Sequence, residues 1–131
     1  METGKIIIPN GVDVWPHELE SAKVLIRYGH TIEFLKAIDQ KGKQTADCLI
    51  DGITWEMKAP KASSLKAVER NLKRGKWQSC RIIFDSRKMK YVPDKAIKRE
   101  LRKRFAEISE IEKIKFINRH GQMLDIFRGL L

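Results

Sequence analysis

The dipeptide Asp51-Gly52 constrains the fold of this chain more than any other dipeptide in it. It separates two apolar-rich runs within residues 45–59. Asp-Gly between such runs favours a β-hairpin with a two-residue type I′ turn. A two-residue turn fixes which residues pair across the strands, so Asp47 is expected opposite Glu56. Because side chains alternate along a strand, one face of this hairpin is apolar and the other presents the two carboxylates to each other.

Apolar periodicity and turn residues predict the elements around the hairpin. Helices are expected over residues 16–28, 64–74 and 94–108, and strands over 31–38, 81–85, 113–118 and 123–127. In the second helix, Leu65, Val68 and Leu72 are expected to face inward, and Gly75 to end the helix. The order α-β-β-β-α-β-α-β-β predicts an α/β (α+β) fold with a mixed central sheet flanked by helices, and residues 1–131 as a single domain.

The facing acids of the hairpin need an explanation, because like charges in that position destabilise a strand pair. A divalent cation such as Mg²⁺ (or Mn²⁺) would offset the repulsion between Asp47 and Glu56 by binding both carboxylates. Lys58 is expected on the same face, where it can orient an attacking water or neutralise charge on a phosphate. Glu18, at the start of the first helix, is either a further metal ligand or a favourable charge at a helix N-terminus.

Basic and acidic side chains are distributed unevenly along the chain, and this distribution indicates the kind of partner that the protein binds. The 131 residues carry 27 Lys and Arg against 17 Asp and Glu, a net charge of +10. Residues 1–57 hold 6 basic and 9 acidic side chains, net −3, whereas residues 58–131 hold 21 basic and 8 acidic, net +13. The basic half predicts a polyanionic partner, a nucleic acid.

Several classes of protein are excluded by the same sequence. The longest apolar stretches fall far short of the roughly 20 residues that span a bilayer, and the N-terminus lacks a signal-peptide pattern. Cys48 and Cys80 are too few for a disulfide framework or a zinc cluster, so both are expected to be buried free thiols. We therefore expect a cytoplasmic protein that does not bind membranes, and the oligomeric state stays open.

The motif His17-Glu18, then Asp47, then Glu56-Met57-Lys58 resembles that of the PD-(D/E)XK nuclease superfamily. Over residues 15–105 the chain resembles in particular the tRNA-nuclease C-terminal domain of contact-dependent growth inhibition toxins. The resemblance implies that Asp47, Glu56 and Glu18 bind the metal and that Lys58 is the catalytic lysine. It also implies RNA, in particular tRNA, as the substrate, and an immunity protein as partner of a toxin. Ala46 stands where the superfamily motif begins with proline.

The basic residues after the hairpin are the candidates for holding phosphates near the acids, because Lys and Arg give affinity for nucleic acid that is independent of sequence. These residues are Lys61, Lys66, Arg70, Lys73 and Arg74. Trp15 and Trp77 are expected to be packed, and His17 to be a surface or capping residue. The leading prediction is a metal-dependent endonuclease. The alternatives are a DNA endonuclease of the same fold, a non-catalytic nucleic-acid-binding module and a basic protein-interaction domain.

Overall fold

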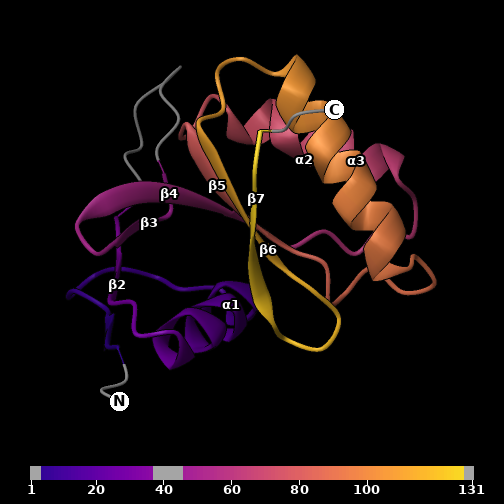
Figure 1. Ribbon diagram of the computed structural model, residues 1–131. Helices are drawn as coiled ribbons and strands as arrows, with labels where there is room; N and C mark the ends of the chain where they lie inside the picture. The colour runs from indigo at the N-terminus through magenta and orange to yellow at the C-terminus, as the bar shows by residue number, and fades with distance from the viewer. Residues whose placement is uncertain (1–3, 37–45, 129–131) are drawn as a thin grey trace.

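The described parts of the chain, residues 4–36 and 46–128 of a computed structural model, form seven strands and three helices (Figure 1). The strands are β1 (Ile6–Ile7), β2 (Ile32–Phe34), β3 (Cys48–Ile50), β4 (Ile53–Lys58), β5 (Arg81–Asp85), β6 (Lys113–Ile117) and β7 (Met123–Ile126). The helices are α1 (Pro16–Arg27), α2 (Lys66–Gly75) and α3 (Asp94–Glu107). None of these helices is long and apolar enough to cross a membrane.

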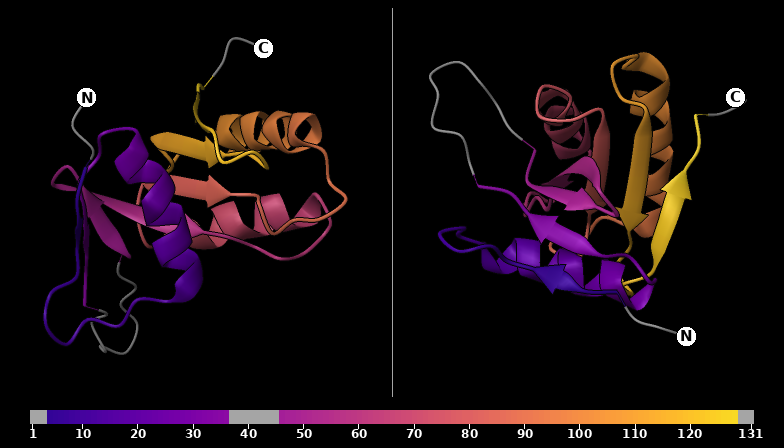
Figure 2. Two further views of the ribbon diagram at one scale, coloured as in Figure 1. Left: turned by 90° about the horizontal axis from the view of Figure 1, so that it is seen from below. Right: turned by 90° about the vertical axis from the view of Figure 1, so that its left-hand side faces the viewer.

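The strands form one mixed sheet in the order β1 to β7, and the helices cover its two faces. The neighbours β1–β2, β4–β5 and β5–β6 are parallel, each joined through a helix, and the other neighbours are antiparallel. Figure 2 shows α1 on one side of the sheet and α2 and α3 on the other. Two cores result, one under α1 with Ile83 of β5, and one under α2 and α3 with Ile82 and Phe84. The predicted mixed α/β architecture is confirmed.

The hairpin has the predicted turn and register. Asp51 and Gly52 both have positive φ, 50° and 85°, as a type I′ turn requires. Cys48 pairs with Trp55, and Ile50 with Ile53. The apolar face is buried except next to the turn, where Ile53 is 48% exposed.

Replacing Gly52 with alanine is expected to lower the free energy of unfolding by about 1 kcal/mol. A Cβ at Gly52 would meet no atom within 4 Å, so the loss would come from the positive φ alone. Thermal unfolding followed by circular dichroism measures this effect. An unchanged melting temperature would show that the turn is not held in this conformation.

Strand β4 changes its partner halfway along its length, and this change positions the site. Its first half, Ile53 to Trp55, pairs with β3, whereas its second half, Glu56 to Lys58, pairs with β5. The ladder between β3 and β4 therefore ends at Cys48 and Trp55. The side chain of Glu56 then lies on the sheet face of its register partner Ile82, which is the face that α2 covers.

Some sequence-based predictions were wrong in detail. The two-residue strand β1 was not predicted, so the observed order begins β-α rather than α. Leu65 precedes the first turn of α2 and is 37% exposed, so only Val68 and Leu72 of the expected stripe face inward. Within the strand predicted over residues 31–38, β2 covers Ile32–Phe34, and residues 37–38 lie outside the described residues. Cys48 and Cys80 are free as predicted, but Cys80 is only half-buried.

Candidate active site

A cavity of about 340 Å³ opens beside the point where β4 changes its partner. The four residues predicted to be catalytic, Glu18, Asp47, Glu56 and Lys58, all line it. Glu18 comes from α1, Asp47 from the residue before β3, and Glu56 and Lys58 from β4. The fold therefore brings together carboxylates separated by up to 38 positions in the sequence.

The carboxylates of Asp47 and Glu56 each accept a hydrogen bond from a backbone N–H of the neighbouring segment. The Asp47 N–H donates to Oε1 of Glu56 at 3.2 Å, and the Met57 N–H donates to Oδ2 of Asp47 at 3.0 Å. The predicted strand pair of Asp47 with Glu56 is not part of the ladder, and the two segments instead meet through these backbone-to-side-chain hydrogen bonds. Each carboxylate is thus fixed by a residue on the other strand.

The carboxylates of the cavity repel one another in a buried setting. Glu56 is only 2% exposed, and burial together with the nearby Asp47 raises its pKa to about 8. Burial likewise raises the pKa of Glu18, and the charge of Asp47 adds to that effect. Such a concentration of negative charge disfavours ionisation, and a bound cation would restore it.

Lys58 is positioned by contacts on two sides. Its Nζ lies 3.1 Å from Oε2 of Glu56 and donates to Oε1 of Gln78 at 2.8 Å. Gly75 leaves room for this side chain, because a Cβ there would lie 3.4 Å from Cε of Lys58 and 2.9 Å from Cδ1 of Ile82. Helix α2 ends at Gly75, as predicted, and this glycine also allows the close packing of Ile82 and Lys58 against the helix.

Glu18 lies at the N-terminus of α1, where its negative charge is favourable, as one of its two predicted roles requires. It also lines the cavity. Its Oε1 accepts a hydrogen bond at 3.0 Å from the N–H of Trp15, the residue before α1, so it helps to cap the helix. Glu18 is also 7% exposed and faces Asp47 in the cavity. Its position is therefore compatible with a contribution to ligand binding, in addition to capping.

The donor set fits a divalent cation at Asp47 and Glu56. Two carboxylates from adjacent strands supply the oxygen ligands that Mg²⁺ prefers, and Mg²⁺ keeps several waters, so it needs few protein ligands. Within residues 4–36 and 46–128, no group of three or more His, Cys, Asp or Glu side chains is arranged to hold a metal ion. Glu18, Asp47 and Glu56 therefore do not form such a three-residue group, and the predicted metal site rests on Asp47 and Glu56.

Several residues of the cavity were not assigned to it from the sequence. Trp15, His17 and Asn71 line it, and Gln78 binds Lys58. Trp15 is 67% exposed and Trp77 is 65% exposed, so the prediction that both are packed was wrong. His17 could have been found from its place beside Glu18, whereas Asn71 and Gln78 lie in the stretch that resembles the toxin domains but received no role from that resemblance.

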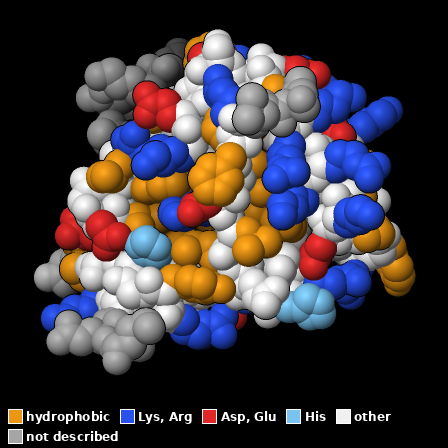
Figure 3. Space-filling view, viewed as in Figure 1, with side chains coloured by type: hydrophobic (Ala, Val, Ile, Leu, Met, Phe, Trp, Pro, Cys, Tyr) orange, Lys and Arg blue, Asp and Glu red, His pale blue; other side chains and the backbone are white. Residues whose placement is uncertain are grey.

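The residues predicted to grip phosphates lie outside the cavity lining. They are all exposed: Lys61, Lys66, Arg70, Lys73 and Arg74. Lys73 pairs with Glu69 at 3.2 Å, one turn away on α2. Lys and Arg side chains also gather over α3 in the space-filling view (Figure 3), so the basic surface extends well beyond the stretch that follows the hairpin.

Comparisons with known proteins agree with this fold and place the chain in a family. A solved CdiA-CT/CdiI toxin and immunity complex from Burkholderia pseudomallei contains a chain with a TM-score of 0.67 and 17% sequence identity, covering 94% of this chain and 98% of that one. No curated protein matches the sequence. The sequence profile of the contact-dependent growth inhibition CdiA C-terminal domain matches residues 43–123, which include the hairpin, Lys58, α2 and α3. The chain therefore belongs to the CdiA C-terminal domain family of contact-dependent growth inhibition proteins.

Proposed function

We propose that this protein is a metal-dependent endonuclease that hydrolyses phosphodiester bonds of RNA, with tRNA as the favoured substrate. One observation carries the proposal: the opposed acids Asp47 and Glu56 share an open cavity with Lys58. A purely structural pair of like charges would only destabilise the hairpin. The arrangement of these residues supports the PD-(D/E)XK type of nuclease.

The four predicted catalytic residues, together with Gln78, have separate tasks in such a reaction. Asp47 and Glu56 would hold Mg²⁺ or Mn²⁺, which supplies an activated water and positive charge at the phosphate. Lys58 can donate a hydrogen bond to a phosphate oxygen as negative charge builds up on it. Gln78 and Glu56 hold the lysine ammonium at 2.8 and 3.1 Å, so it is oriented before substrate arrives. Glu18 fixes the start of α1 beside Asp47 and adds negative charge.

A toxin role is supported by the relatives of the chain. The solved neighbour is described as a toxin in complex with its immunity protein. By analogy, we propose that this domain acts as a toxin and that an immunity protein inhibits it. A net charge of +10 favours an acidic surface on such an inhibitor.

Purified protein incubated with total tRNA and with plasmid DNA tests the proposal. We expect cleavage of tRNA with Mg²⁺ or Mn²⁺ and none with EDTA. The variants Glu56→Ala and Lys58→Ala should each lose about 10²–10³-fold in rate, as when a group that stabilises developing charge is removed. Cleavage of plasmid alone would favour a DNA endonuclease, and wild-type rates in both variants would exclude this cavity as the active site.

A further inference from the structure

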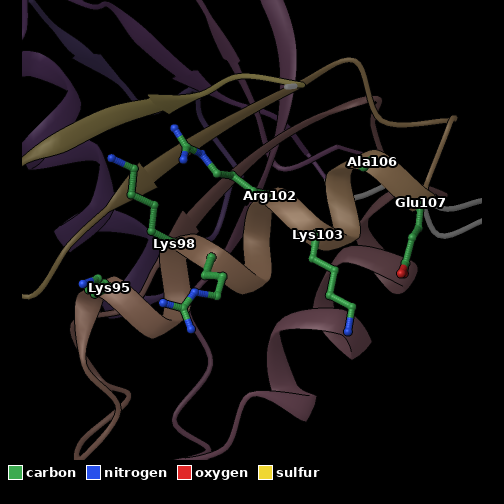
Figure 4. A pocket seen from close by; sticks show the side chains of 7 residues that line it. Lys95, Lys98, Arg102, Lys103, Ala106 and Glu107 are labelled. Carbon is green, nitrogen blue, oxygen red and sulfur yellow. The ribbon is translucent and has the colours of Figure 1, made fainter. Parts of the chain in front are cut away.

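The outer face of α3 is a separate basic surface. Basic side chains recur there at the spacing of one helix face and line a hollow of about 540 Å³: Lys95, Lys98, Arg99, Arg102 and Lys103. Figure 4 shows the labelled lysines and Arg102 projecting from the helix. At a rise of 1.5 Å per residue, the stretch from Lys95 to Lys103 is about 12 Å long. We call these five residues the α3 basic stripe.

The positive charges of the α3 basic stripe are not neutralised by ion pairs with other described residues. Among the described residues, none of the five forms an ion pair. Arg104, next to them on α3, is different, because it contacts Glu69, Glu100 and Glu107 at 2.5 to 2.8 Å. Acidic residues of α2 and α3 therefore neutralise Arg104, whereas the α3 basic stripe stays available to an anion outside the protein.

The composition of the stripe favours a polyphosphate over a protein partner. Its hollow contains one acid, Glu107, and no aromatic side chain, and Ala106 is the only apolar residue. Protein interfaces are enriched in aromatic residues and depleted of lysine at their centres. Three lysines and two arginines along one helix face are instead typical of a surface that binds nucleic-acid backbone.

The α3 basic stripe lies apart from the carboxylates of the candidate active site. It shares no residue with the lining of the active-site cavity. Helix α2 lies between them, since its Asn71 lines the cavity and its Glu69 contacts Arg104 of α3. A helix is about 10 Å wide with its side chains, so only a substrate longer than a few nucleotides can reach both places.

We propose that the α3 basic stripe binds the sugar-phosphate backbone of a folded RNA substrate at a second place, remote from the cleaved bond. This inference rests on the proposed function for the identity of the anion. The stripe makes the enzyme prefer large, structured RNA over short single strands. It contributes to substrate affinity and leaves the chemical step unchanged.

A triple variant, Lys98→Gln, Arg102→Gln and Lys103→Gln, tests the stripe. Binding of tRNA is measured in the Asp47→Asn background, where cleavage is expected to be slow, by fluorescence anisotropy between about 50 and 200 mM NaCl. The loss of three phosphate contacts should lower the slope of log affinity against log salt by about 2 to 3. In the chain that keeps Asp47, the KM for tRNA should rise at least about tenfold, with kcat and all kinetics on a trinucleotide unchanged.

A matched triple variant, Lys5→Gln, Lys23→Gln and Lys113→Gln, removes equal charge from exposed positions elsewhere. It should keep the salt slope of the parent protein. Equal slopes in the two triple variants, or equal losses on tRNA and trinucleotide, would overturn the inference. Weaker binding of an acidic partner protein with an unchanged tRNA slope would also overturn it. If the wild type cuts no RNA but the slope still falls, the stripe binds RNA and the proposed nuclease activity is wrong.

Discussion

Replacing Asp47 with asparagine is expected to reduce RNA cleavage about 10²–10³-fold and at the same time to raise the melting temperature. Asparagine keeps an oxygen that can accept from the Met57 N–H, now at 3.0 Å from Oδ2. It removes the negative charge that raises the pKa of both Glu18 and Glu56. The gain in stability should be about 0.5–1 kcal/mol, or roughly 3 °C. Initial cleavage rates and thermal unfolding measure the two effects.

Asp51→Asn is a matched control four residues away. Asp51 accepts from the Thr31 N–H at 2.9 Å and lies 2.7 Å from Nδ1 of His30, contacts that lower its pKa. Its negative charge therefore favours the folded state, and the variant should melt slightly lower and cleave as wild type. If Asp47→Asn cleaves normally, Asp47 is not in the site. If it melts lower than wild type, the acids do not oppose each other as described.

Replacing Asp85 with alanine is expected to destabilise the fold by about 3 kcal/mol, a drop in melting temperature of roughly 10 °C. Asp85 ends β5, is 4% exposed, and accepts from Oγ of Ser21 on α1 at 2.8 Å. Its Oδ2 also lies 2.7 Å from Nη2 of Arg87. The variant would leave this half-buried guanidinium without its partner. Urea unfolding measures the loss.

Arg87 provides the comparison for Asp85. The double variant Asp85→Ala with Arg87→Ala should be more stable than Asp85→Ala alone, because no unpaired charge is then left behind. Ser21→Ala alone should cost only about 1 kcal/mol, the usual value of one hydrogen bond. A double variant that is less stable than either single variant would show that the ion pair is not the source of the loss.

The features of the fold that depend on residues close together in the sequence could be predicted from it. The turn at Asp51-Gly52 needs positive φ at both positions, and few dipeptides meet that requirement. Helix α3 carries apolar residues at intervals of three to four, a pattern typical of one buried helix face, and Ile97, Leu101 and Phe105 are buried. The proximity of Asp47 and Glu56 was predicted from the same turn, because its length sets the register, although the ladder ends one pair before them.

Contacts between distant segments could not be predicted in this way. Gln78 binds Lys58 across 20 positions, and Ser21 binds Asp85 across 64. The role of Gly75 depends on the approach of Ile82 from the sheet, although its sequence context is typical of a helix end. Strand β1 has two residues and pairs with β2, and no local pattern in the sequence reveals so short a strand.

The change of partner along β4 places the candidate active site between two parts of the sheet. Asp47 precedes β3 in one part, whereas Glu56 and Lys58 pair with β5 in the other. Parts of a protein can open locally with less free energy than global unfolding requires. A separation of β3 from β4 would move Asp47 away from Glu56 and Lys58 while the core under α2 and α3 stays intact, so loss of the proposed activity is expected to report such a local opening.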